Sequence, residues 1–139
     1  MITNDLRLGN LVGVPFNPNL SLKTMISGIE IYKVIGIKPK YVDLESIEYP
    51  LSRSLAMIFH QPIPLTEEWL LKFGFEKQEN NWKRICICND WTYLYWERLA
   101  GLEVSVNKHS IMLPHINSVH QLQNLYYALT NEELTYDPN

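Results

Sequence analysis

Apolar and polar residues alternate along much of the first third of the chain, which predicts β-strands. A short apolar strand over residues 11–16 follows a turn at Gly9 and Asn10, and a second strand over residues 28–37 ends before Pro39. In the second strand the isoleucines share one side and Glu30 and Tyr32 share the other, as expected for a half-buried strand. Residues 41–44 predict a third strand, and residues 51–59 are ambiguous.

The segment PIPLTEEWLLKFGF predicts a short helix over residues 67–73, with residues that favour both of its ends. Thr66 is a favourable N-cap, and the two glutamates after it lie at the positive end of the helix dipole. Gly74 supplies the left-handed residue after the helix, which allows Phe75 to fold back on Leu70. The apolar face of this helix consists of Trp69, Leu70 and Phe73.

Alternating segments after this helix predict an antiparallel meander of about four strands, over residues 82–88, 91–97, 101–106 and 110–114. Asn89 and Asp90 are residue types that tolerate a tight hairpin turn between the first two strands. A final helix begins at the capping-box spacing Ser118-x-x-Gln121 and ends near Asn131. Its apolar stripe consists of Val119, Leu122, Leu125, Tyr126 and Leu129.

These elements predict an α+β fold. It consists of an N-terminal small β lobe, a short capped helix, the antiparallel β-meander and a C-terminal helix packed on the sheet. At 139 residues we expect a single domain (1–139), with a β lobe over residues 1–60 and a helix–meander–helix lobe over residues 61–139. A chain of this length can bury a sizeable core without a disulfide or a structural metal.

Composition and charge exclude some classes of partner. Apolar residues make up 46% of the chain and charged residues 19%, as in ordinary globular domains. The net charge of −3 argues against nucleic acid as the main partner, because proteins that neutralise phosphates have a basic excess. No segment resembles a signal peptide, and no apolar run approaches the ~18 residues of a membrane span. We therefore expect a cytoplasmic protein without a membrane partner.

The pair Cys86-x-Cys88 is a candidate for metal or redox chemistry. Both side chains would point to one face of a strand, but zinc usually requires a second pair of ligands, and none of the four histidines forms one. We therefore expect structural cysteines, no metal and no cofactor. The sequence contains no nucleophile elbow, phosphate-binding glycine loop or His-Glu-x-x-His motif. We therefore favour a protein without catalytic residues. An enzyme of unknown class is the least favoured of three alternatives, after a protein that binds another protein and one that binds a small ligand.

The hairpin ICICNDWTYLYWER predicts a strand register. A two-residue turn at Asn89 and Asp90 places Arg84 opposite Tyr95 and extends the same face to Cys86. If the next loop spans residues 98–101, this face continues into two valines of the following strand and forms the core. The opposite face is then a mixed surface made of Ile85, Ile87, Leu94, Trp96, Lys83, Glu103 and Ser105.

Four large apolar residues on one sheet face are too many to leave in water, so this mixed face must be covered. Three alternatives follow: the N-terminal lobe or a helix of the same chain, a partner or second subunit, or a small ligand. A three-residue turn would exchange the two faces. As an interface, the mixed face would use Ile85, Ile87, Leu94, Trp96 and Lys83.

A small-ligand site is the second alternative for function. Trp91 or Trp96 could stack on a nucleotide-type signal whose phosphates contact Arg84 or Lys83. His120 lies close to the start of the last helix, beside free backbone N–H groups. It is either a ligand contact or a side chain that bonds the preceding loop.

Three segments, DLRLGNLV, PIPLTEEWLLKFGFEK and VHQLQNLYYALTNEELT, together resemble a family of small uncharacterised proteins of Bacteroidetes prophages and mobile elements. The resemblance brings no catalytic residues; it implies a setting in which small proteins act on host machinery or host defence. We therefore expect a non-catalytic binding protein that acts on a host protein in the bacterial cytoplasm. Inhibition of host defence is one role that fits this setting, and a homodimer is one expected state. The alternative is a protein that binds and sequesters a nucleotide-type signal.

Overall fold

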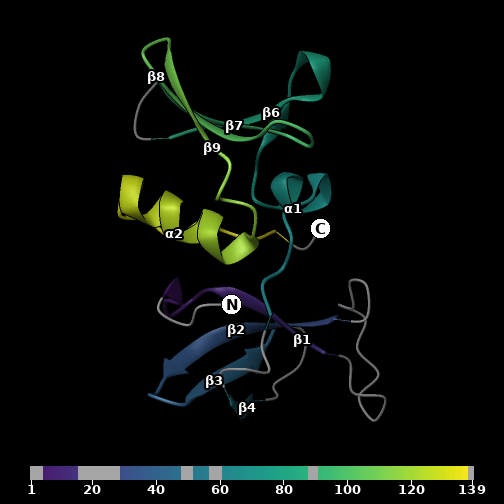
Figure 1. Cartoon of the computed structure of the whole chain (residues 1–139), viewed down its shortest axis with the longest axis vertical. Coiled ribbons are helices and arrows are strands. Elements are labelled where there is room, and N and C mark those ends of the chain that lie inside the picture. Colours follow the sequence, from purple (N-terminus) through teal and green to yellow (C-terminus); the bar gives the residue numbers. More distant parts are fainter. Residues whose placement is uncertain (1–4, 16–28, 48–51, 57–60, 88–90, 138–139) are drawn as a thin grey trace. The chain divides into compact units, whose positions relative to one another are not determined.

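The computed structural model describes residues 5–15, 29–47, 52–56, 61–87 and 91–137. The chain forms two compact units, Met1–Ile63 and Pro64–Asn139, and the division falls close to the predicted lobe boundary between residues 60 and 61. Each unit contains one sheet, and both helices belong to the second unit (Figure 1). The fold is α+β, as predicted. No helix within the described ranges is long and apolar enough to cross a membrane.

The first unit is a four-stranded antiparallel sheet whose strands follow one another in chain order. The strands are β1 (Leu11–Pro15), β2 (Ile29–Ile37), β3 (Tyr41–Ser46) and β4 (Ser52–Ala56). β4 lies in the segment that the sequence pattern left ambiguous. The buried cluster of this unit consists of Leu6, Val12, Val14, Tyr32, Val34, Val42 and Leu44.

Of the two predicted sides of β2, the side of Glu30 and Tyr32 is the more deeply buried one. Ile31 is buried, but Ile35 and Ile37 are 44% and 42% exposed, whereas Glu30 and Tyr32 are fully buried. The Tyr32 hydroxyl donates a 2.8 Å hydrogen bond to the Glu30 carboxylate, which satisfies both polar groups inside the unit. The pairing with β3 also shifts by one residue between Val34 and Gly36, so simple alternation fails along this strand.

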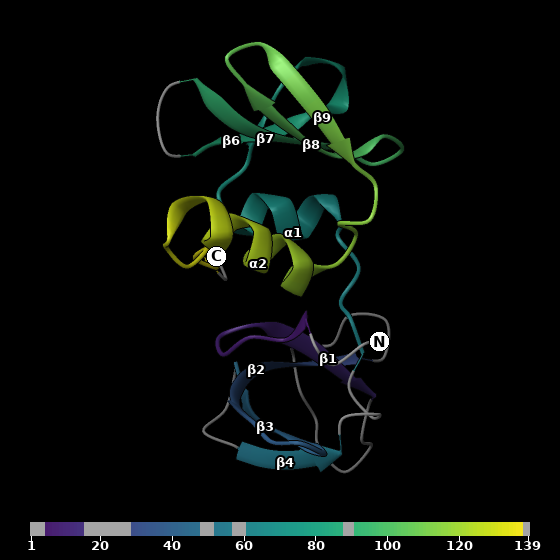
Figure 2. The ribbon, with the colours of Figure 1, turned by 60° about the vertical axis from the view of Figure 1, so that its left-hand side comes forward.

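The second unit is a five-stranded antiparallel meander with a helix on either side of it in sequence. Its strands are β5 (Glu76–Lys77), β6 (Lys83–Cys86), β7 (Thr92–Glu97), β8 (Gly101–Val106) and β9 (His109–Leu113). The helices are α1 (Glu67–Lys72) and α2 (Val119–Thr130), and a 3-10 turn, η3 (Glu79–Asn81), separates β5 from β6. β5 was not predicted, because two residues are too few to show an alternating pattern. Both helices lie on the same side of this sheet (Figures 1 and 2).

Helix α1 has the ends that its sequence predicts. The Thr66 hydroxyl oxygen accepts the backbone N–H of Trp69 at 3.4 Å, as an N-cap does. Gly74 follows the helix with φ +92°, and the Phe75 N–H then donates to the Leu70 carbonyl oxygen at 3.0 Å. This is the closing hydrogen bond of a Schellman motif, which ends the helix at its C-cap residue, Phe73. Trp69, Leu70 and Phe73 are all buried.

Helix α2 packs on the sheet as predicted, with Val119 and Leu122 fully buried, whereas Leu129 near its end is 39% exposed. Its cap differs from the predicted capping box, because the Gln121 side-chain oxygen accepts the N–H of Asn117 rather than that of the N-cap residue (3.0 Å). The segment after α2 returns to α1, where the Tyr136 ring lies 5.2 Å from that of Trp69 and 6.3 Å from that of Phe73.

Candidate functional site

The register of the five-stranded sheet decides which of its faces is buried. Between β6 and β7 the pairing is as predicted, with Arg84 opposite Tyr95. Between β7 and β8 the prediction was wrong by one residue, because Tyr95 lies opposite Glu103 instead of Val104. A shift of one residue moves every side chain of a strand to the other face. The observed pairing of β6, β7 and β8 therefore decides which side chains share a face of the sheet.

The turn between β7 and β8 explains the shift. Glu97 pairs with Gly101, so the loop is one residue shorter than expected. The Glu97 carboxylate accepts the backbone N–H groups of Leu99 and Ala100, both at 2.8 Å. Gly101 adopts φ +85°, the left-handed conformation that closes a common type of three-residue hairpin loop. A glycine four residues after Glu97 was the sequence signal for this shorter loop.

The face toward the helices, here called the inner face, contains Ile87, Leu94 and Trp96, which are 2%, 0% and 6% exposed. The folded chain itself covers these side chains, which is the first of the three alternatives for this patch. Ile85, on the same face, is half-buried. The opposite, or outer, face contains Cys86, Tyr93 and Tyr95, and the prediction that these residues form the core was wrong. Cys86 is exposed and the two tyrosines are half-buried.

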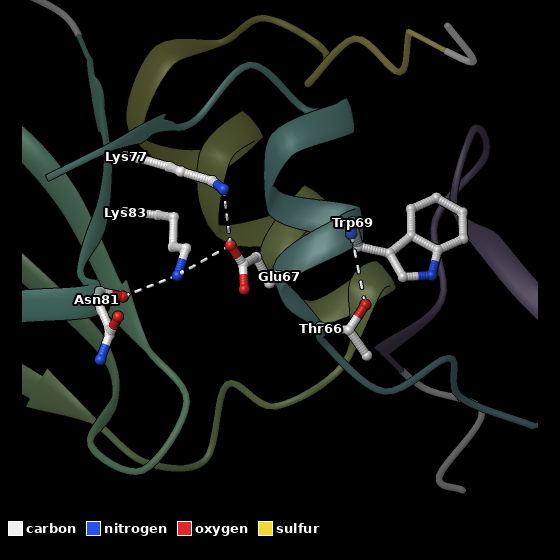
Figure 3. A network of polar contacts seen from close by, with 6 residues as sticks. All are labelled: Thr66, Glu67, Trp69, Lys77, Asn81 and Lys83. Carbon is white, nitrogen blue, oxygen red and sulfur yellow. Dashed lines mark hydrogen bonds and ion pairs between the residues drawn. The ribbon is translucent and has the colours of Figure 1, made fainter.

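Lys83 is a buried lysine on the inner face, only 5% exposed. Its ammonium donates to the Asn81 carbonyl oxygen at 2.8 Å and lies 3.4 Å from a carboxylate oxygen of Glu67 (Figure 3). Lys77 approaches the same oxygen of Glu67 at 3.4 Å. The hydrogen bond from Lys83 is the main cause of the lowered pKa of Glu67. The Lys83 ammonium also lies 5.9 Å from the centre of the Trp96 ring. These internal partners hold Lys83 inside the unit, away from the surface.

The outer face contains an open groove with a volume of about 430 Å³. The strand pairing aligns one row of side chains across the sheet, from Arg84 through Tyr95 to Glu103. The segment between β5 and β6 adds a second wall. The groove is lined by Gln78, Glu79, Trp82, Arg84, Tyr95 and Glu103.

Aromatic rings and a guanidinium shape this groove. The rings of Trp82 and Tyr95 meet edge to face, with centroids 6.3 Å apart. The Arg84 guanidinium lies 4.8 Å from the centre of the Tyr93 ring. A hydrogen bond with Tyr95 raises the pKa of Arg84 above its ordinary value. Arg84 is thus held against the sheet by two tyrosines, and its planar group extends the aromatic surface.

The charge of the groove is negative on balance. Among its described lining residues, two carboxylates, Glu79 and Glu103, accompany one cation, Arg84, which already contacts the two tyrosines. Glu76 lies directly opposite Arg84 on the neighbouring strand and adds a further carboxylate to the same face. A positively charged group would therefore be favoured in this groove, and a phosphate group would meet repulsion.

The remaining predicted ligand residues lie apart from one another. Trp91 is 66% exposed and directly precedes β7, whereas Trp96 is on the inner face. His120 is buried at the start of α2, and its Nδ1 lies 3.2 Å from the hydroxyl of Ser118, the residue before the helix. This contact is the one expected of a side chain that bonds the preceding loop. Of the predicted ligand residues, only Arg84 lines the groove.

Sequence reasoning missed most of the groove. Trp82, Gln78 and Glu79 belong to a tight connection in which Asn80 and Asn81 have φ values of +60° and +68°. The adjacent asparagines were the available signal, because asparagine tolerates the left-handed region better than most residues.

No metal site is found in the described part of the chain, where no three histidine, cysteine, aspartate or glutamate side chains lie close enough to share an ion. Comparisons of the chain with protein-family models, with curated proteins and with solved structures found no match.

Proposed function

We propose that this protein is a non-catalytic binding protein, and that it binds a protein partner with the outer face of its five-stranded sheet. The groove between the β5–β6 connection and β8 is the centre of the binding site. It receives a basic side chain, lysine or arginine, from the partner. The observation that supports this most directly is that the rings of Trp82 and Tyr95, which meet edge to face, line the same groove as the carboxylates of Glu79 and Glu103.

Aromatic rings and carboxylates together suit a cation. The electron-rich face of an aromatic ring attracts an ammonium or guanidinium group, and a nearby carboxylate adds a charge-assisted hydrogen bond. Tryptophan, tyrosine and arginine are also the residue types most enriched among the energetically dominant positions of protein interfaces. Trp82, Tyr95 and Arg84 bring all three types together on an accessible surface.

The same charges disfavour the alternative of a nucleotide-type ligand. In that hypothesis Trp91 or Trp96 stacks on the ligand and Arg84 or Lys83 contacts its phosphates. Trp96 and Lys83 are buried on the inner face, and Trp91, which is 66% exposed, is not among the described residues that line the groove. Arg84 remains, and it shares the groove with two carboxylates that would repel phosphates. A protein partner with a basic surface also complements the net charge of −3.

The kind of partner that we propose comes from the setting that the sequence resemblance implies. In a prophage or mobile element the available partners are proteins of the bacterial host, and a binder without catalytic residues acts by occupying their surfaces. Inhibition of a host-defence protein is the role that we propose for such binding.

Charge reversal in the groove tests this proposal. The double variant E79K/E103K reverses both carboxylates, and E45K/E132K makes the same change in net charge at two exposed glutamates outside the groove. Both variants and the wild-type chain serve as bait in a lysate of a Bacteroidetes host, with circular dichroism to check folding. We expect a host protein retained by the wild-type chain and by E45K/E132K. Its recovery should fall at least about tenfold with E79K/E103K, equivalent to about 1.4 kcal/mol of binding free energy.

Equal recovery of the same proteins by all three baits would refute the groove as the binding site. Thermal stabilisation of the wild-type chain by a nucleotide, lost with Arg84→Ala, would instead support the small-ligand alternative.

A further inference from the structure

We propose that β9 is a self-association edge, at which two copies of the chain pair their β9 strands antiparallel about a two-fold axis at Ile111. This edge adjoins the groove, because Met112 lies opposite the groove residue Glu103, but the proposal does not depend on the proposed function. The pairing would join the two five-stranded sheets into one continuous sheet.

The backbone of β9 has hydrogen-bonding groups on the side away from β8. The turn between β8 and β9 consists of Asn107 and Lys108, both with positive φ (48° and 69°), and it is closed by the pair Val106 and His109. In such a two-residue hairpin the closing pair is hydrogen-bonded, and hydrogen-bonded pairs alternate along the ladder. The N–H and C=O groups of Ser110 and Met112 therefore point away from β8. None of the hydrogen bonds between described residues uses these groups.

Within the part of the chain that the structure describes, β9 has none of the features that usually protect a sheet edge. The opposite edge of the same sheet, β5, is only two residues long and consists of Glu76 and Lys77. In the other unit, β1 is covered by reciprocal 2.8 Å hydrogen bonds between Gly13 and Gln61. β9 is five residues long, with the sequence HSIML, and contains no lysine, carboxylate, proline or register shift.

Two apolar side chains of this edge are exposed. Ile111 is 68% exposed and Met112 is 43% exposed, on opposite faces of the same strand. Ile111 ends a row across the sheet that runs through Leu94 and Val104. An antiparallel partner strand would extend this apolar row beyond Ile111.

A second copy of the chain satisfies this edge completely. In an antiparallel pairing centred on Ile111, Ser110 lies opposite Met112 of the second copy, and the outward backbone groups of both residues are paired in both copies. Ile111 then lies opposite Ile111 of the second copy as a non-hydrogen-bonded pair, with Cβ atoms roughly 4.5–5.5 Å apart. No like charges meet, because β9 contains no lysine, arginine, aspartate or glutamate.

Sedimentation equilibrium tests the dimer, and Met112→Pro tests the edge. Proline at position 112 removes only an outward N–H group, which edge strands tolerate, and Met112→Leu is the matched control. We expect the wild-type chain and Met112→Leu to approach twice the monomer mass of 16.3 kDa, and Met112→Pro to remain at that mass with a similar circular dichroism spectrum. A wild-type chain that stays monomeric at about 1 mM overturns the proposal. A dimer that persists in Met112→Pro also overturns it, because the copies then meet at another surface.

Cysteine cross-linking tests the register. In a chain with both native cysteines replaced by serine, Ile111→Cys should form an intermolecular disulfide under mild oxidation. Ser110→Cys is the control, since its counterpart in the second copy lies diagonally, roughly 7–8 Å away, too far for an unstrained bridge. We expect at least a tenfold faster cross-link for Ile111→Cys. Equal rates would overturn the two-fold at Ile111. A monomer that instead captures another protein, in a manner abolished by Met112→Pro, would assign the edge to a different partner.

Discussion

Replacing Leu94 by alanine removes most of a side chain from the centre of the inner face. Leu94 is fully buried, and it lies between Ile85 and Val104 on the two neighbouring strands. Buried Leu→Ala substitutions cost about 2–5 kcal/mol, because the transfer free energy of the lost atoms adds to that of the cavity. For a residue in the middle of a sheet that helices cover, we expect about 3 kcal/mol. The unit Pro64–Asn139 has a total stability of about 4–11 kcal/mol at typical values per residue.

Tryptophan fluorescence measures this effect in the relevant unit alone, because all four tryptophans belong to Pro64–Asn139. In urea, a slope of about 1 kcal/mol per molar converts the expected loss into a midpoint lower by about 3 M. Leu99→Ala is the control, since Leu99 is 88% exposed in the β7–β8 turn and should change the free energy of unfolding by less than about 0.5 kcal/mol. A Leu94→Ala loss below about 1 kcal/mol, or equal losses in both variants, would refute the assignment of the inner face.

Three further predictions concern other parts of the fold. Gly74→Ala should destabilise the second unit by about 1–2 kcal/mol in urea unfolding, because φ is +92° there, and Gly74→Asn should cost less. The pKa of Asp43 is lowered, chiefly by a 2.8 Å hydrogen bond from Ser54, so Asp43 stabilises the fold above its unfolded pKa and this stabilisation is lost as the pH falls through the folded pKa. An NMR titration should show a higher Asp43 pKa in Ser54→Ala. Tyr136→Ala should shift the emission of Trp69 to longer wavelength and lower the midpoint of urea unfolding.

Sequence patterns within a few residues predicted both helices and most of the strands. The caps of α1 depend on Thr66 and Gly74, which act within a few residues of sequence, and both behave as expected. The order of elements and the α+β class followed from the change between alternating and helical patterns. Each of these conclusions needs only neighbouring residues, so a single sequence contains enough information for them.

The assignment of faces failed because it depends on counting residues through turns. One residue fewer in the loop before Gly101 was enough to exchange the buried and accessible sides of β6 and β7. The groove was missed for a related reason. Trp82 and Glu103 come from separate parts of the chain, and only the register of the intervening strands brings them together. In both cases a long-range pairing decided the outcome, and that pairing is set by turn geometry.

The contact between Tyr136 and Trp69 has a consequence for the order in which the protein folds as it is synthesised. Both sheets are meanders, so each strand can pair as soon as the next one has been made. The unit Met1–Ile63 can therefore form early, while the ribosome is still translating the second unit. Trp69 is translated well before the ring that packs on it, and in the interval the apolar side of α1 is open to chaperones and to other nascent chains.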